Sequence, residues 1–277
     1  MFCRNLKYYR LKNRLTTEEL AERIGIKSDC ILRYEAGMEK PDFETVRKLS
    51  YGLGVNLSDF LISGGADVVI CTEEDDFDAI TSAFVQVSIE DYFDRFFTLL
   101  DILGVKMTRN PIPDIAYTSL SDSQEICRRI GLFIGIEQQD SPAGFLEILE
   151  NSGILIVALE ADPVFSGKSG TVNGFPFIAL NSSLTNEQIV KVAAKELVSS
   201  LVSWDETLSK NEIETKKAEM INILISMLDV VDLQGNEEPT MFQELTIHAI
   251  SQGIISRQRG AELLRVPYEM MDKLCVF

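Results

Sequence analysis

The stretch from Thr16 to Gly37 constrains the fold of this chain most strongly, because its spacing predicts two short helices joined by a tight turn. Thr16 stands three residues before Glu19, which is the spacing of a capping box at the start of a helix. Gly25 follows the apolar stripe of that helix, where a residue that tolerates positive φ commonly ends a helix. The next helix stops at Gly37, and Pro41 prevents a straight continuation. The pattern therefore predicts a helix-turn-helix.

This pair lies within residues 1–66, which we expect to form an all-helical head of five short helices. A chain of 277 residues has room for about two domains. Residues 67–118 are expected to be an acidic linker with a connecting helix, and residues 119–277 a second domain. The overall fold class predicted is mainly α, with a small sheet in the second domain.

The charge of the chain is unevenly distributed. There are 26 Lys and Arg against 43 Asp and Glu, a net charge of −17. Residues 1–66 contain eleven basic and nine acidic side chains, so the excess of acid lies in residues 67–277. A protein with this overall charge is not drawn to nucleic acid as a whole. Any contact with DNA must therefore come from the head.

A set of residues at fixed spacings runs through the head over about 60 residues. These are Arg10, Leu15, Thr16, Leu20, Ala21, Gly25, Ile26, Ile31, Glu35, Gly37, Pro41, Leu49, Leu53, Gly54, Val55 and Leu57. In these residues the head resembles the Cro/lambda-repressor-type (XRE) family of DNA-binding domains, which implies a five-helix fold and a double-stranded DNA operator as partner.

In such a pair the N-terminal residues of the second helix lie at base edges in the major groove. Here these residues are Lys27, Ser28 and Asp29, with Arg33 one turn further on. We expect Lys27 to contact a phosphate and Arg33 to pair with guanine O6 and N7. Ser28 either caps the helix or reaches a base. Asp29 either accepts a hydrogen bond from cytosine N4 or is a favourable charge at the helix start.

Two further contacts with the DNA backbone are expected outside that helix. The family usually has Gln at the start of its second helix to hold a phosphate, and this chain has Thr17, whose hydroxyl reaches less far. Lys40 is the second candidate. The resemblance implies that Arg10 and Glu35 form a structural ion pair. Because one such domain makes few contacts, we expect a homodimer on a two-fold site.

The connector begins with an acidic block over residues 73–78. Aromatic and aliphatic residues then recur at helical spacing. Two interpretations remain open: a helix that faces the core of its own chain, and a dimerisation helix, since such a stripe is costly to expose. The stripe consists of Ile89, Tyr92, Phe93, Phe96, Phe97, Leu100 and Leu103.

The second domain has a mixed pattern. Strands are expected over 153–159 and 175–181 with a hairpin-like loop over 167–174 between them, and helices over 125–136, 142–151, 185–201 and 214–228. This order resembles the ImmA/IrrE-type metallopeptidase family over about 110 residues, which implies an α+β zincin-like fold.

The zinc motif of that family is His-Glu-x-x-His, with two histidine ligands one helical turn apart. The aligned residues here are Lys195, Glu196 and Ser199, and the third ligand of the family falls on Glu219. The chain has a single histidine, His248, so no substitute pair exists. We therefore expect no metal, no cofactor and no enzymatic activity.

The remnant of that site leaves two hypotheses. Lys195, Glu196 and Glu219 are expected to form an ion-paired cluster beside a pocket for a small ligand or a protein partner. Alternatively, Lys195 and Ser199, at i and i+4, resemble a Ser–Lys nucleophile pair.

The tail forms a second helical pair, capped by Ser256 and by Val266-Pro267, and carries Arg257, Arg259 and Arg265. It is expected to pack as a cap on the second domain, or else to contact DNA. His248, just upstream on an apolar helix, is expected in the core or at a partner contact.

The five cysteines are scattered and form no Cys-x-x-Cys pair, which favours a reducing cytoplasm. No apolar run approaches the roughly 18 residues of a membrane helix, and the basic start lacks the apolar region of a signal peptide. The sequence thus predicts a cytoplasmic, dimeric transcriptional regulator, a repressor, with a catalytically dead peptidase-like domain. The alternatives are an antitoxin-like or scaffolding protein that autoregulates its operon, and an active hydrolase.

Overall fold

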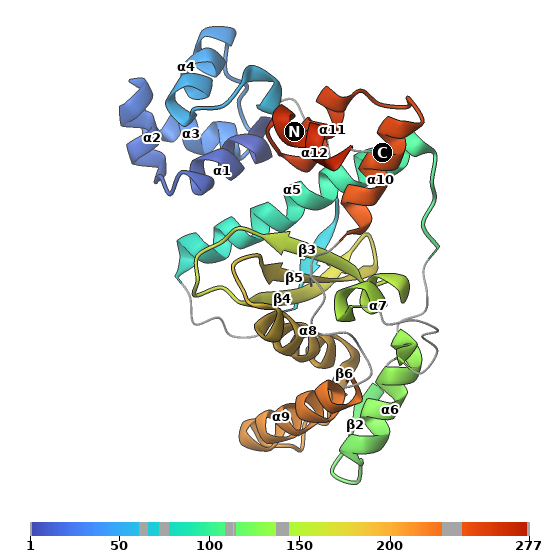
Figure 1. Cartoon of the computed structure of the whole chain (residues 1–277). Coiled ribbons are helices and arrows are strands. Elements are labelled where there is room, and N and C mark those ends of the chain that lie inside the picture. The colour runs from blue at the N-terminus through green and yellow to red at the C-terminus, as the bar shows by residue number, and fades with distance from the viewer. Residues whose placement is uncertain are drawn as a thin grey trace. The chain divides into compact units, whose positions relative to one another are not determined.

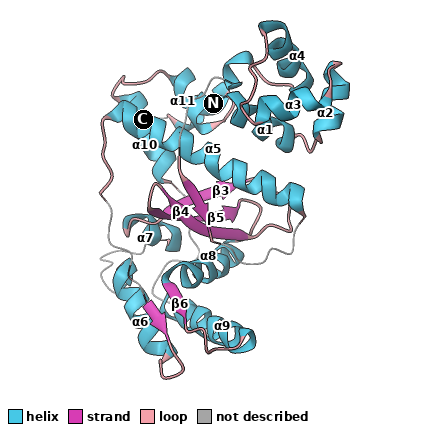
Figure 2. Ribbon diagram, turned by 180° about the vertical axis from the view of Figure 1, so that it is seen from behind, coloured by secondary structure: helices cyan, strands magenta, loops and turns pink. Residues whose placement is uncertain are grey.

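The computed structural model describes residues 2–60, 66–71, 78–108, 113, 115–136, 144–228 and 240–275. Helices predominate, and the strands form one four-stranded and one two-stranded sheet (Figures 1 and 2). The chain divides into two compact units. One comprises Met1–Ala66, Asp75–Lys106 and Phe242–Phe277, and the other Asp67–Glu74 and Met107–Met241.

The head of the first unit consists of short helices around one apolar core. They are α1 (Phe2–Lys12), α2 (Thr17–Ile24), α3 (Ser28–Glu35) and α4 (Phe43–Leu53), followed by a 3₁₀ turn, η1 (Leu57–Phe60). Each contributes at least one side chain with no exposed surface to the core, and these are Leu6, Leu20, Ile31, Leu49 and Phe60. The predicted helix-turn-helix is therefore present. Of the five helices expected in the head, only the last is reduced to a single 3₁₀ turn.

Local signals fix the ends of these helices. The Thr16 hydroxyl accepts from the Glu19 amide, and the Glu19 carboxylate accepts from the Thr16 amide, so the predicted capping box is confirmed. Gly25 ends α2 at φ +72°, as its conformational freedom allows. The cap expected from Ser28 is wrong: α3 begins at Ser28, and Lys27 occupies the cap position without a side-chain hydrogen bond.

The long helix α5 (Ala79–Leu103) belongs to the same unit as the head and packs on α1. Asp78 caps it by accepting from the Thr81 amide. Its predicted stripe is largely buried, with Phe93 fully inaccessible. Tyr92 and Phe96 contact the ring of Phe242, at centroid distances of 5.2 and 5.6 Å. These contacts support the core-facing interpretation of the stripe. The acidic block before it lies outside the described residues, apart from Asp78.

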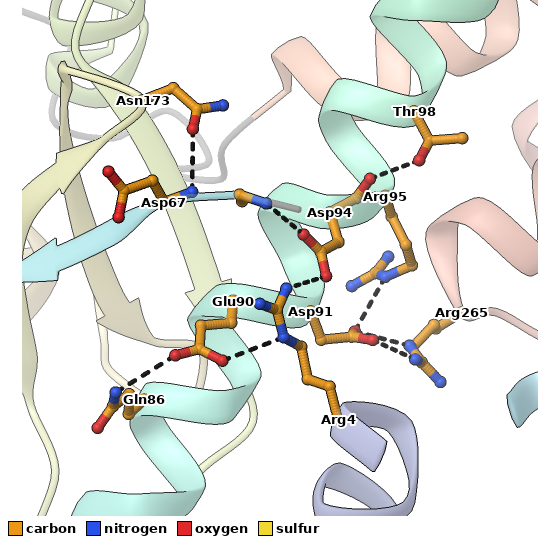
Figure 3. Close-up of polar contacts among 11 residues, drawn as sticks. Arg4, Asp67, Gln86, Glu90, Asp91, Asp94, Arg95, Thr98, Asn173 and Arg265 are labelled. Atoms are coloured by element: carbon orange, nitrogen blue, oxygen red, sulfur yellow. Dashed lines mark hydrogen bonds and ion pairs between the residues drawn. The ribbon is translucent and has the colours of Figure 1, made fainter. Parts of the chain in front are cut away.

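Three tail helices complete the first unit: α10 (Met241–Ser251), α11 (Arg257–Leu264) and α12 (Tyr268–Leu274). A buried charge cluster joins them to α5 (Figure 3). The Asp91 carboxylate accepts from Arg95 Nε at 3.0 Å and from Arg265 Nε at 2.8 Å, and it also pairs with Arg265 Nη2. Arg265 lies over the rings of Tyr8 and Tyr9 in α1, with 4.5 and 4.8 Å to their centroids.

The tail is thus grouped with the head, whereas the sequence places residues 242–277 in the second domain. The physical reason is the match between Phe242, Arg265 and their partners on α5, which no local pattern reveals. Arg265 is buried, so it is not available for the DNA contact that was one of the two expectations for the tail. Ser256 caps α11 as predicted, by accepting from the Arg259 amide. His248 is exposed on α10 and is not a core residue.

The second unit is built on a mixed sheet in the order β1-β4-β5-β3. Its strands are β1 (Val68–Ile70), β3 (Leu155–Leu159), β4 (Gly167–Val172) and β5 (Phe175–Asn181). β3 runs parallel to β5, whereas β4 is antiparallel to β5 and β1. α8 (Asn186–Leu201) packs on β4 and β5, and α7 (Phe145–Asn151) on β3 (Figure 1).

The remaining elements of this unit extend from α8. α9 (Lys210–Met227) packs on α8 and on α6 (Ser123–Ile134), and β2 (Ile115–Tyr117) pairs in parallel with β6 (Val202–Trp204). A continuous apolar core includes Ile130, Leu149 and Leu197, all without exposed surface. No helix in the described part of the chain is both long and apolar enough to cross a membrane.

The predicted hairpin-like loop over 167–174 is largely wrong. Residues 167–172 form strand β4, and the turn is only Asn173-Gly174, both at positive φ. An Asn-Gly pair is a strong hairpin signal, so the sequence does mark the correct turn. The predicted loop was too long because Gly167 and Gly170 were counted as loop residues, whereas both lie in β4. Gly170 is required because a Cβ there would lie 2.2 Å from the Val69 carbonyl oxygen. The short strands β1, β2 and β6 were not expected, because three residues are too few for a periodic pattern.

Candidate nucleic-acid interface

The second helix of the turn, α3, has one face fixed in the core and one face exposed. Ile31 and Tyr34 are buried and anchor the inner face. The turn before α3 is held by the Ile26 amide, which donates to the Ala21 carbonyl at 3.0 Å. Lys27 and Asp29 are exposed at the start of the helix. Burial of the inner face therefore decides which side chains are presented to solvent.

A bidentate ion pair ties α3 to α1. Arg10 Nε donates to Glu35 Oε1 at 2.6 Å, and Arg10 Nη2 donates to Glu35 Oε2 at 2.8 Å. Arg10 Nη1 also donates to the Leu15 carbonyl at 2.7 Å, so the guanidinium spans the start of the turn as well. Both partners are about nine-tenths buried. The predicted structural pair is confirmed, and its planar geometry fixes the orientation of α3.

Arg33, the predicted guanine-reading residue, lies half exposed on the outer face of α3 with every guanidinium nitrogen in contact with a neighbour. Its Nη1 is 3.1 Å from Asp29 Oδ2, and its Nε is 3.0 Å from Glu39 Oε2. Its Nη2 lies 3.6 Å from Cys30 Sγ. The Cys30 contact and these two carboxylates raise the pKa of Arg33 above its usual value. The pairing with Asp29 follows from their i, i+4 spacing.

The other predicted contacts lie at neighbouring positions. Ser28 is half buried as the first residue of α3, and Lys40 is exposed beyond its end. Thr17 is half buried as the first residue of α2, and its hydroxyl donates to Glu18 Oε2 at 3.0 Å. Internal hydrogen bonds, including that from Thr17, lower the pKa of the Glu18 carboxyl. A phosphate would therefore have to compete with Glu18 for the Thr17 hydroxyl.

Two residues of this surface were not predicted. Glu39 lies in the turn after α3 and pairs with Arg33, although its acidic character beside Lys40 was visible in the sequence. Leu32 is 51% exposed, next to Arg33. The sequence could have indicated this exposure, because Leu32 does not share the three-residue spacing of the buried Ile31 and Tyr34. An apolar side chain at such a place suits the methyl group of thymine.

In the second unit, the residues aligned with the zinc motif lie on α8. Glu196 is buried, and its Oε2 accepts from the Ser169 hydroxyl of β4 at 3.0 Å. Its Oε1 lies 3.5 Å from Nζ of the half-exposed Lys195. The structure thus brings together the ammonium and the carboxylate of the remnant, and it ties the carboxylate to the sheet.

The other two residues of the remnant have different surroundings. Glu219 on α9 pairs with Lys216 at 2.6 Å, and this contact lowers the pKa of its carboxyl. The Ser199 hydroxyl is buried and has no hydrogen-bond partner in the described part of the chain. Lys195 therefore donates no hydrogen bond to the Ser199 hydroxyl. Within the described residues, no three His, Cys, Asp or Glu side chains are grouped to hold a metal ion.

Comparison with known proteins is in keeping with the geometry of the head. A family model described as Helix-turn-helix matches residues 6–60. The chain is 35% identical over 57 residues to the uncharacterized HTH-type transcriptional regulator MJ0272 of Methanocaldococcus jannaschii, covering 21% of this chain and 86% of that protein. The chain therefore belongs to the helix-turn-helix family of transcriptional regulators.

Two further relatives match over a similar length. The uncharacterized HTH-type transcriptional regulator YqaE of Bacillus subtilis is 34% identical over 74 residues, which is 27% of this chain and 63% of that protein. The cryptic phage CTXphi transcriptional repressor RstR of Vibrio cholerae is 34% identical over 61 residues, 22% of this chain and 55% of that protein. The chain thus spans less than two thirds of either relative. No solved structure matches significantly.

Proposed function

We propose that this protein is a sequence-specific DNA-binding transcriptional regulator that acts as a repressor, with α3 as its recognition helix. The observation that carries the proposal is the two-sided character of α3. Ile31 and Tyr34 lock one face into the core, and Arg33 stands exposed on the other face. A relative of similar sequence over the head, RstR, is named a transcriptional repressor.

The roles of the exposed residues follow from their chemistry. Lys27, Lys40 and the Thr17 hydroxyl contact phosphates and set the register of the protein on the duplex. Arg33 pairs with guanine, a contact worth about 1–3 kcal/mol of discrimination. Asp29 orients Arg33 from one turn earlier, and its carboxylate is a suitable acceptor for cytosine N4. Ser28, the first residue of the helix, reaches a base.

One head makes few contacts, so useful affinity requires a homodimer on a two-fold operator. The second unit acts as a peptidase-like regulatory domain without catalysis, metal or cofactor. Two observations support this part: a lysine occupies the first ligand position of the motif, and Glu196 is engaged with Ser169 and Lys195. A small ligand or a protein partner binds this domain, and the protein acts in the cytoplasm.

The alternative is an antitoxin-like or scaffolding protein whose acidic second unit binds a basic protein, with the same head acting on its own operon. The excess of acid in residues 67–277 favours such a partner. Co-purification of a stoichiometric basic protein from the native source supports the alternative, and its absence supports the first proposal.

The test compares Arg33→Ala with Arg47→Ala in the full chain. Both changes remove one exposed arginine, but Arg47 lies on α4 and pairs with Glu44. Genomic fragments enriched by the unaltered protein are used in fluorescence anisotropy. We expect Arg33→Ala to lose about 5- to 150-fold in affinity for the enriched fragment, and Arg47→Ala to lose much less. If the two variants, both still dimeric, prefer the enriched fragment to the same degree, the assignment of α3 as the recognition helix is refuted.

A further inference from the structure

Arg33 is held by two carboxylates rather than one, and the second comes from outside its helix. Asp29 pairs with it along α3, whereas Glu39 approaches from the turn beyond the end of the helix. The three side chains together carry a net charge of −1 on the surface that would face DNA. An exposed arginine intended only to attract phosphates would gain nothing from such an arrangement.

The position of Glu39 is fixed by the backbone and not only by its side chain. The amides of Met38 and Glu39 both point to the carbonyl oxygen of Arg33, at 2.9 and 3.4 Å. Gly37, at φ +69°, makes this return of the chain possible. The turn therefore wraps back on the same residue whose guanidinium the Glu39 carboxylate contacts.

We propose that Glu39 is a specificity-determining residue. It positions Arg33 for a base edge and weakens binding to DNA sites at which Arg33 would meet only phosphates. This inference rests on the proposed function of α3. Nε faces Glu39, and Nη1 faces Asp29, so the guanidinium is held in one orientation before DNA arrives. The N–H groups of Nη1 and Nη2 that do not face a carboxylate are left for guanine, and only the 3.6 Å contact of Nη2 with Cys30 Sγ competes for them. Both carboxylates, those of Asp29 and Glu39, repel phosphates that come close to the helix.

The physical consequence is a larger difference between the affinity for the specific site and the affinity for non-specific DNA. Specificity is a difference of affinities, and an unpaired charge placed against the wrong partner increases that difference. A carboxylate that lies within one Debye length of a phosphate, about 10 Å at an ionic strength of 0.1 M, is only partly screened. Removing the Glu39 carboxylate should therefore raise non-specific affinity about two- to fivefold at low salt.

The test uses Glu39→Gln in the full chain, with Glu44→Gln as the matched control. Each variant loses one exposed carboxylate from an arginine pair, but Glu44 pairs with Arg47 on α4, outside the recognition helix. Binding is measured by anisotropy over a salt series to two probes. One is the genomic fragment most enriched by the unaltered protein, and the other is a 30-bp duplex of random sequence.

We expect Glu39→Gln to bind the random duplex about two- to fivefold more tightly than Glu44→Gln does, and to show a smaller ratio of specific to random affinity. The double variant Arg33→Ala/Glu39→Gln separates positioning from charge. Without Arg33, the change at Glu39 should still raise random binding but leave the affinity ratio unaltered.

Different outcomes overturn different statements. If Glu39→Gln and Glu44→Gln behave alike while Arg33→Ala loses selectivity, the role of Glu39 is refuted and that of α3 stands. If Glu39→Gln alters the ratio equally with and without Arg33, Glu39 acts by charge alone, and the positioning role is refuted. If the unaltered protein enriches no fragment and binds neither duplex at low salt, the proposed function itself fails.

Discussion

The buried charge cluster on α5 gives the most direct quantitative prediction. Asp91→Asn keeps the shape of the side chain but removes the negative charge that faces Arg95 and Arg265. The three side chains are 2%, 8% and 13% exposed. Burial raises the pKa of Asp91 and lowers that of Arg265, so each group depends on its oppositely charged neighbours to remain ionised. Two arginines would be left buried without their shared carboxylate.

Removing one partner of a buried pair costs about 3–5 kcal/mol, since the remaining charge is neither hydrated nor neutralised. The loss here should fall in that range. The loss of stability is reduced for Arg265, because its guanidinium keeps its contacts with the Tyr8 and Tyr9 rings. A domain is typically stable by 5–15 kcal/mol, so the variant should lose a large part of the stability of the first unit.

The assay is hydrogen exchange of the full chain, read by mass spectrometry, together with denaturant unfolding followed by far-ultraviolet circular dichroism. Protection should fall in α1, α5 and α11 together, because the cluster joins these three helices. Protection of α8 should change less. Glu187→Gln is the control, since it breaks only an exposed pair with Lys191 and should have no measurable effect. A loss below about 1 kcal/mol, or loosening confined to α5, refutes the reasoning.

Two other predictions concern the second unit. Gly170→Val should separate β1 from β4, because a Cβ there would lie 2.2 Å from the Val69 carbonyl oxygen; we expect a loss of about 1–3 kcal/mol, and unaltered exchange of the β1 amides would contradict it. Cys127 should resist iodoacetamide at pH 8 in the folded protein. Burial raises its pKa to about 12, so its thiolate fraction is about a thousandfold lower than that of an ordinary cysteine. Labelling of Cys127 as fast as of Cys30 in peptide maps would exclude this.

The sequence determined those features whose physical cause is local. A capping box joins Thr16 to Glu19, and a glycine with positive φ ends the same helix at Gly25, so both were readable within a few residues. The i, i+4 spacing of Asp29 and Arg33 was likewise visible. The position of α3 as a second helix followed from these signals, and Lys27, Asp29 and Arg33 are exposed as expected, whereas the exposed Leu32 was not predicted.

Only the tertiary structure decided the contacts between distant segments. Asp91 and Arg265 are 174 residues apart, and neither residue type indicates its partner, so the tail was assigned to the wrong unit. The pairing of Glu39 with Arg33 depends on a turn that folds back on α3, which spacing alone does not specify. Helix caps are set by chain neighbours, whereas burial and charge pairing depend on which surfaces meet once the chain has folded.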